Sequence, residues 1–167
     1  GKMGFRLSKN LQKSEEFETA HVEVSEAGRS RLRDELGIEC VNAGEAVAGA
    51  QVVILAVPDT LIRKISADLS PMMTSGTMVV TLDAAAPFAG HLPDRKDLVY
   101  FVTHPCHPLI FSDETDPEAR KDYFGGDKGK QSIVSALMQG PEEAFALGEK
   151  VGCTIYQPIL RSHRVTV

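Results

Sequence analysis

The sequence predicts an α/β fold in which helices cover both faces of a doubly wound parallel sheet. Strand-like and helix-like segments alternate along the chain, and two apolar runs, at residues 51–58 and 77–87, read as strands buried on both faces. The chain also opens with GKMG, a glycine pair that leads into a helical pattern. In a Rossmann-like fold such a pair follows a first strand, so we expect a Rossmann-like sheet that lacks its first strand.

Composition narrows the class of protein. The 167 residues are 43% hydrophobic and 25% charged, which is ordinary globular usage with one sizeable core. A net charge of -5 without any block of basic residues argues against a nucleic-acid partner. No apolar run is long enough to span a membrane, no leader pattern is present, and three widely spaced cysteines suggest no disulfide framework. We therefore expect a soluble, cytoplasmic protein that binds a small molecule, with no nucleic-acid or membrane partner.

The amino-terminal elements follow from local patterns. Apolar side chains at helical spacing predict the first helix, alternation predicts the strand after it, and Ser25 and Gly37 are a typical N-cap and stop for the next helix. The expected order is a helix at 4–13, a strand at 19–24, a helix at 25–37, a short strand at 38–41 and a short helix at 42–50.

The second half continues the alternation with apolar runs and amphipathic segments. We expect, in order, a strand at 51–58, a helix at 59–70, strands at 77–87 and 98–105, a polar irregular stretch at 112–130, a strand at 132–138 and a helix at 141–152. Such an order favours right-handed crossovers within one sheet.

A glycine pair and a carboxylate predict the cofactor. Gly1 and Gly4 stand at the start of the first helix, where a pyrophosphate binds, and Glu23 lies about 20 positions on, where the ribose hydroxyls are received. A carboxylate there repels the 2′-phosphate of NADP, so NAD is predicted; alternatively, Glu23 is a solvent-facing strand residue between two valines. The predicted cofactor-binding residues are Gly1, Lys2, Met3, Gly4, Glu23, Val57 and Pro58.

Side chains that can take part in catalysis are concentrated in one segment, VTHPCHPLIF, residues 102–111. His104 and His107 each precede a proline, so both lie on an extended segment at the end of a buried strand, where ligands bind in open α/β sheets. Histidine can transfer a proton or bind a metal near neutral pH. We predict a functional role for this pair and a packing role for the Cys106 thiol.

Carboxylates elsewhere are further candidates. Asp83 ends its strand and is predicted to orient substrate or the nicotinamide ribose. Glu142 and Glu143 lie in the first turn of a helix, where interaction with the helix dipole explains them and a metal or substrate role is the alternative.

These segments together carry a family resemblance. GKMGFRLSKNLQKS, HVEVSEAGRSRL, VVILAVPDTLI, LDAAAPFAGHLP, YFVTHPCHP, KDYFGG, ALMQGPEEAFALGE and RSHRVTV resemble the NAD-dependent D-apionate oxidoisomerase family, a distant relative of the 6-phosphogluconate and β-hydroxyacid dehydrogenases. The resemblance covers nearly the whole chain. It implies that residues 1–157 are an N-terminally truncated dinucleotide-binding domain and that residues 158–167 begin a helical C-terminal domain.

The resemblance also implies a reaction and an assembly. It implies an oxidoreductase of apiose catabolism, homodimeric when complete, that oxidises D-apionate at C2 with NAD and isomerises the product to 3-oxo-isoapionate. This needs a base for the hydroxyl protons and an electrophile at the ketone, which a divalent metal ion could supply. His104 or His107 is the predicted base or metal ligand. The predicted catalytic residues are His104, His107 and Asp83, and the predicted metal ligands are His107, Glu142 (or Glu143) and His163.

Two other functions remain open at this stage. A hydroxyacid or sugar-acid dehydrogenase without isomerisation would keep every residue named above, so only the product distinguishes it. A non-catalytic NAD(H)-binding domain would keep the glycine pair and Glu23 but would not need the paired histidines.

Overall fold

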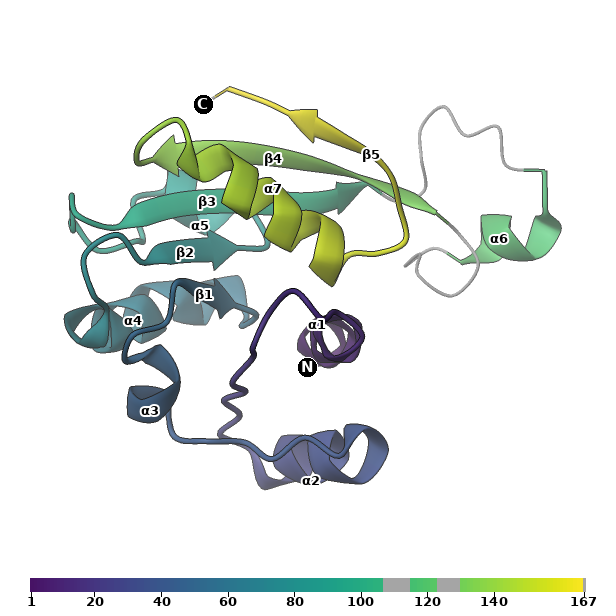
Figure 1. Cartoon of the computed structure of the whole chain (residues 1–167), viewed down its shortest axis with the longest axis horizontal. Helices are drawn as coiled ribbons and strands as arrows, with labels where there is room; N and C mark the ends of the chain where they lie inside the picture. The colour runs from purple at the N-terminus through teal and green to yellow at the C-terminus, as the bar shows by residue number, and fades with distance from the viewer. Residues whose placement is uncertain (107–114, 123–129, 167) are drawn as a thin grey trace.

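The computed structural model describes residues 1–106, 115–122 and 130–166. Figure 1 shows one sheet with helices packed on it. The strands are β1 (Val52–Leu55), β2 (Met78–Thr81), β3 (Val99–Cys106), β4 (Gln131–Gln139) and β5 (Ile159–Arg164). The helices are α1 (Lys2–Gln12), α2 (Glu26–Leu36), α3 (Ala43–Val47), α4 (Asp59–Leu69), the 3-10 turn η1 (Ser70–Met72), α5 (Ala85–Phe88), α6 (Pro117–Lys121) and α7 (Ala144–Ile155).

The sheet has the order β1-β2-β3-β4-β5. β1, β2 and β3 are parallel, β4 runs antiparallel to β3, and β5 runs parallel to β4. The predicted α/β, Rossmann-like class is confirmed, with a mostly parallel sheet. Because β1 to β3 are parallel, their carboxyl ends share one edge of the sheet, where β4 begins.

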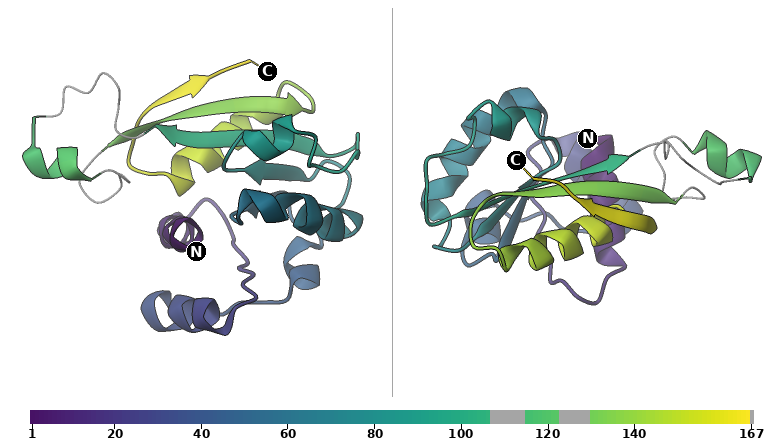
Figure 2. Two further views of the ribbon diagram at one scale, coloured as in Figure 1. Left: turned by 180° about the vertical axis from the view of Figure 1, so that it is seen from behind. Right: turned by 90° about the horizontal axis from the view of Figure 1, so that it is seen from above.

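Each face of the sheet has its own helices. On one face, Ile62 of α4 packs with Leu55, Val79 and Tyr100. On the other face α7 lies against β3 and β4 (Figure 2). Within the described ranges, no helix is long and apolar enough to cross a membrane.

Close packing of α7 depends on two glycines. A Cβ atom placed on Gly148 would lie 2.5 Å from ring atoms of Phe101, and one on Gly152 would lie 2.8 Å from Oγ1 of Thr103. No side chain larger than hydrogen fits at either position without a shift. The two glycines, one helical turn apart, therefore fix which face of β3 is covered by α7.

Two strands expected near the amino terminus are not strands. Residues 19–24 and 38–41 are extended, and the backbone N–H of Val41 donates to the carbonyl of His21 at 2.9 Å. The pattern of apolar alternation predicts an extended backbone, but a strand also needs a hydrogen-bonded ladder with a neighbour. Neither segment has such a ladder within the described part of the chain.

Other boundaries differ for local reasons. The strand expected at 77–87 ends at Thr81, and helix α5 follows after Asp83. The stretch expected to be irregular contains α6, which the side chain of Asp116 caps by accepting from the N–H of Glu118 at 2.9 Å. Residues 159–164, expected to begin a helical domain, form β5 in the same sheet, so the boundary at residue 157 remains a prediction.

Candidate functional site

The start of α1 lies beside the carboxyl end of β1. A Cβ atom on Gly4 would lie 3.6 Å from the Cβ atom of Ala56, which follows β1 directly. The N-cap is Gly1, and no side chain of the described residues caps the helix. The amides of Lys2, Met3 and Gly4 are therefore the orphan donors of a helix N-terminus, and such donors bind anions.

Glu23 is held near this helix start. Its Oε1 accepts from the N–H of Ser25 at 2.9 Å, and this bond is the first cause that lowers the pKa of Glu23. The segment that carries Glu23 lies beside α1, because Nδ1 of His21 is 3.1 Å from Oγ of Ser8. A Cβ atom on Gly28 would lie 2.6 Å from Cδ of Glu23, so a larger residue there would push the carboxylate away. The structure thus places the Glu23 segment beside α1, the helix that begins with Gly1 and Gly4.

The two arginines near Glu23 are differently placed. The guanidinium of Arg31 lies 3.7 Å from the ring centroid of Phe5, and its Nε donates to Glu35 at 2.8 Å. Arg29 donates to the carbonyl of Val24 at 3.2 Å. Arg31 is therefore engaged by α1 and by its own helix.

His104 and Asp83 meet at the carboxyl edge. His104 is near the end of β3, and its Nδ1 lies 2.7 Å from the carbonyl of Leu82, which follows β2. Because a carbonyl only accepts, Nδ1 carries the proton, and Nε2 of the neutral ring keeps its lone pair. Oδ2 of Asp83 lies 3.9 Å from the same Nδ1, and the His104 side chain is 52% exposed. The arrangement suits a histidine that takes a proton at Nε2.

A local turn sets the position of Asp83. Its Oδ1 accepts from the N–H of Ala85 at 2.7 Å, which begins α5 just after the strand. The carboxylate is thereby tied to the backbone beside Leu82, the residue whose carbonyl binds His104. Val57 and Pro58 follow β1 at the same edge, and Pro58 is the N-cap of α4.

The expected metal ligands are not brought together. Glu142 follows β4 at the end away from His104, because Cys106 pairs with Ser132 and Tyr100 pairs with Gln139 in the register of β3 and β4. Seven residues of β4 separate those two pairs, which is about 23 Å at the usual rise per residue.

The carboxylate of Glu142 has another partner. Both of its oxygens accept from Arg164, one of them from Nη2 at 2.7 Å, and this pairing lowers the pKa of Glu142. Glu143 is the N-cap of α7, and His163 lies on β5 opposite Val134. His107 lies outside the described residues. Among those described, no three potential ligands of a metal ion converge.

The sequence pattern missed Arg6. Burial raises the pKa of the Tyr156 phenol, the charge of Arg6 opposes this rise, and the charge of Asp83 adds to it. Arg6 and Asp83 are therefore both within electrostatic reach of Tyr156, whose hydroxyl donates to the carbonyl of Thr103 at 3.3 Å. Arg6 is four residues before Asn10, so both lie on the same side of α1, and Asn10 donates to the carbonyl of Ile155. This helical spacing was the pattern from which the sequence could have indicated that Arg6 faces the rest of the protein.

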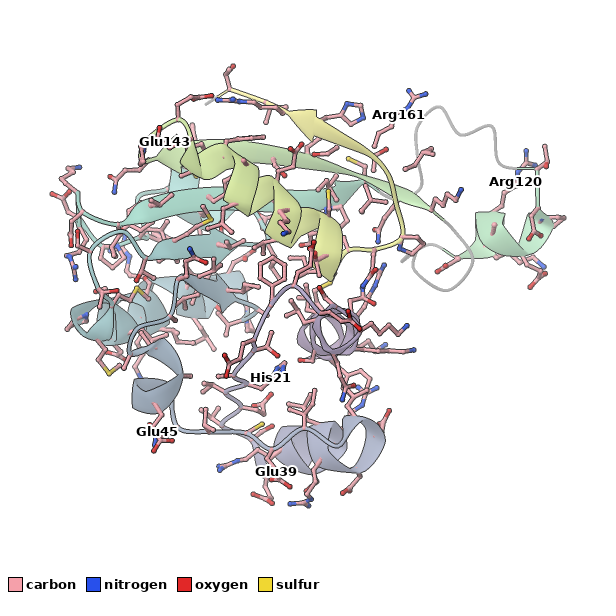
Figure 3. All side chains as sticks on the ribbon, viewed as in Figure 1. His21, Glu39, Glu45, Arg120, Glu143 and Arg161 are labelled. Atoms are coloured by element: carbon pink, nitrogen blue, oxygen red, sulfur yellow. The ribbon has the colours of Figure 1, made fainter. Side chains whose placement is uncertain are left out.

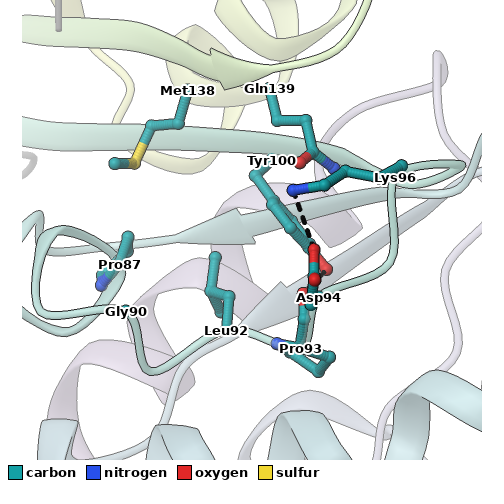
Figure 4. Close-up of a pocket in the computed structure, with 9 residues that line it drawn as sticks. All are labelled: Pro87, Gly90, Leu92, Pro93, Asp94, Lys96, Tyr100, Met138 and Gln139. Carbon is teal, nitrogen blue, oxygen red and sulfur yellow. Dashed lines mark hydrogen bonds and ion pairs between the residues drawn. The ribbon is translucent and has the colours of Figure 1, made fainter.

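A pocket of about 400 Å³ lies elsewhere. Figure 4 shows its lining residues, Pro87, Gly90, Leu92, Pro93, Asp94, Lys96, Tyr100, Met138 and Gln139. Lys96 pairs with Asp94 at 2.7 Å, and the Tyr100 hydroxyl donates to the carbonyl of Pro93 at 2.5 Å. Tyr100 lies near the start of β3 and His104 near its end, so this pocket is separate from the candidate site.

Known proteins resemble the chain over its whole length. A D-apionate oxidoisomerase from Cupriavidus necator is 70% identical over 167 residues, which is 100% of this chain and 60% of that protein. A D-apionate oxidoisomerase from Rhizobium rhizogenes is 63% identical over the same shares. The chain is a homologue of the D-apionate oxidoisomerases. The resemblance predicted from the sequence is confirmed, and the chain spans about 60% of the length of these relatives.

Structural similarity agrees with the sequence comparison. The crystal structure of a semialdehyde dehydrogenase NAD-binding protein from Cupriavidus necator, in complex with calcium and NAD, matches with a TM-score of 0.93 and 69% identity. The match covers 99% of this chain and 60% of that one. Residues 112–167 also match the family described as phosphogluconate dehydrogenase (decarboxylating) C-term.

Proposed function

We propose that this chain is the dinucleotide-binding part of an NAD-dependent oxidoisomerase that converts D-apionate to 3-oxo-isoapionate. One observation carries the proposal: His104, with its tautomer fixed by the Leu82 carbonyl at 2.7 Å, lies at the sheet edge that also holds the start of α1. The whole-chain identity to D-apionate oxidoisomerases gives the substrate. A cytoplasmic location and a homodimer of the complete protein remain predictions.

The residues at the edge fit NAD. The free amides at the start of α1 suit a pyrophosphate, and Glu23, ionised and fixed by Ser25, suits the two ribose hydroxyls. A carboxylate at this place disfavours a 2′-phosphate, and Arg31, held by Phe5 and Glu35, does not offset it. The related structure solved with NAD supports the same choice.

The first step is an oxidation at C2. Bound NAD supplies a hydride acceptor. Nε2 of His104 takes the proton of the C2 hydroxyl as the C2 hydride leaves, which gives a 2-keto acid. The Asp83 carboxylate, 3.9 Å from Nδ1, stabilises the imidazolium that forms.

The second step is a rearrangement within the 2-keto acid. A base takes the proton of the tertiary C3 hydroxyl, the bond from C3 to a hydroxymethyl group breaks, and that group bonds to C2. C3 becomes a ketone, and the C2 oxygen receives the proton. His104 can serve both transfers if its Nε2 returns to the neutral form between them. The predicted metal ligands do not fit a common site among the described residues, so no step is assigned to a metal ion.

Replacement of His104 tests this function. In the full-length protein, His104→Ala should lower kcat/KM for D-apionate by about 100-fold or more, because a positioned base contributes about 10²–10⁴ in rate. The Kd for NADH should stay within a few-fold of wild type. His91→Gln is the matched control, since within the described part of the chain only the backbone groups of His91 form hydrogen bonds. Turnover by His104→Ala within a few-fold of wild type would contradict the assignment.

Product identification separates the oxidoisomerase from a simple dehydrogenase. ¹³C NMR of the product should show a ketone at C3 and a quaternary C2 that carries a hydroxymethyl group. Accumulation of the 2-keto acid instead would favour the dehydrogenase without isomerisation.

A further inference from the structure

The orientation of β5 follows from its contacts. The guanidinium of Arg164 lies 4.3 Å from the ring centroid of Phe145, which is in α7, so Arg164 faces α7. Successive side chains of a strand point to opposite faces. His163 therefore faces the side of the sheet away from α7, and so does Arg161, two residues before it.

The same alternation places His104. Gly152 of α7 approaches Thr103, so Thr103 faces α7 and His104 faces away from it. His104, His163 and Arg161 thus share one face. Seen from behind in Figure 2, α5 lies over this face near β2 and β3, and within the described ranges no helix lies over β4 and β5.

Strand register puts these residues in adjacent rows. His104 pairs with Val134, and Val134 pairs with His163. Two residues further towards the carboxyl end of β3, and on the same face, Cys106 pairs with Ser132, and Ser132 pairs with Arg161. Arg161 is therefore two strands across from His104 and two residues along the strand direction. At the usual strand spacings their backbones are about 12 Å apart.

Arg161 is available to a ligand. It is exposed, Figure 3 labels it on β5 at the outer edge of the sheet, and no hydrogen bond or ion pair is recorded for it with the described residues. Its neighbour on the other face, Arg164, is instead bound to Glu142. An arginine side chain is long enough to cover about half of the separation from His104, and a sugar acid of five carbons can bridge the rest.

We propose that Arg161 binds the carboxylate of the sugar-acid substrate and thereby orients its C2 hydroxyl towards His104. The planar guanidinium matches a carboxylate with two parallel hydrogen bonds, which a lysine cannot reproduce. This assignment rests on the proposed function. It makes Arg161 a substrate-binding residue rather than a charge that only protects an edge strand from pairing with another chain.

Substrate kinetics of Arg161→Gln in the full-length protein test the proposal. KM for D-apionate should rise about 10- to 100-fold, the range for loss of a charge-assisted hydrogen bond, with a smaller effect on kcat and an unchanged Kd for NADH. Added guanidinium ion should restore part of the lost activity, and Arg161→Lys should keep an intermediate KM. Arg63→Gln, on α4, is the matched control, because Arg63 is also an exposed arginine whose side chain makes no hydrogen bond or ion pair with the described residues.

The uncharged amide of D-apionate gives a second readout. If Arg161 binds the carboxylate, Arg161→Gln should leave KM for the amide as it is in wild type. An unchanged KM for D-apionate in an active Arg161→Gln variant would overturn the proposal, whether or not the variant aggregates. It would favour the role in which Arg161 only keeps the edge strand β5 from pairing with another chain. If the wild-type protein does not turn over D-apionate at all, the proposed function fails, and this inference fails with it.

Discussion

The role of His104 depends on one backbone carbonyl. The sequence indicates that a histidine before proline lies at a strand end, but it does not show which ring nitrogen is engaged. The Leu82 carbonyl decides this, because Leu82 directly follows β2, the parallel neighbour of the strand that carries His104. Cys106, two residues on, belongs to the same face of the sheet.

Glu23 carries the residue-scale prediction on pH. Its folded-state pKa is lowered, first by the Ser25 amide, so the carboxylate is ionised at all pH values above the ordinary glutamate pKa. The stability that it adds is present above that ordinary pKa and is lost as pH falls through the lowered one. Between about pH 6 and pH 9, Glu23 should therefore stay ionised. The dependence of NADH affinity on pH should be the same in wild type and in Glu23→Gln over that range.

Fluorescence titrations of NADH measure this directly. Glu23→Gln should weaken NADH binding about 10-fold, through loss of charge-assisted bonds to ribose, by the same amount at each pH in that range. Glu26→Gln is the control, because Glu26 is a nearby carboxylate, in the first turn of α2, and is exposed. A Kd ratio that changes steeply with pH would show that Glu23 titrates there and would contradict the argument.

At the scale of elements, helix α7 positions both β3 and α1. Its glycines bring the helix against Phe101 and Thr103. Its carboxyl end receives α1, where Nδ2 of Asn10 donates to the carbonyl of Ile155 at 2.9 Å and the side chain of Gln157 donates back to the carbonyl of Asn10 at 3.1 Å. The anion-binding start of α1 and the His104 strand are thus fixed to one helix.

Gly148→Ala should therefore destabilise the protein. The added methyl would lie 2.5 Å from the Phe101 ring, and overpacking of this kind costs about 1–3 kcal/mol despite the better helix propensity of alanine. Gly44→Ala in α3 is the matched control, since its Cβ would meet nothing nearer than 3.4 Å. Urea denaturation gives both free energies of unfolding. Equal stability of the two variants would mean that α7 moves aside at little cost.

At the scale of the whole molecule, the sequence predicted the parallel strands but not which other segments pair with a neighbour. β1, β2 and β3 were evident because each is a nearly continuous apolar run, and Ser25 and Gly37 bound α2 as expected, with Gly37 at a φ of 67°. Alternation at residues 19–24 gave an extended segment but not a ladder. Pairing is a property of two segments, and one sequence pattern reports only on one of them.

The same limit explains the site. The sequence analysis placed both His104 and Asp83 at strand ends, and the two residues meet because β2 and β3 are parallel neighbours. Glu142 follows β4, and only the antiparallel direction of β4 sends it to the opposite edge. Arg161 became visible as a candidate only through the register of β5, which no local pattern reports.

Ligand-linked stability tests the assembled cofactor site, because α1, Glu23 and the ends of β1 and β2 must be ordered together for binding. NADH at about 100 times its Kd should raise the free energy of unfolding of the full-length protein by about 2.7 kcal/mol. NADPH at the same concentration should add little, since the Glu23 carboxylate repels a 2′-phosphate. Thermal or urea unfolding with each nucleotide measures this. Equal stabilisation by both would mean that Glu23 does not face the ribose, and stabilisation by neither would remove the cofactor on which the proposed oxidation depends.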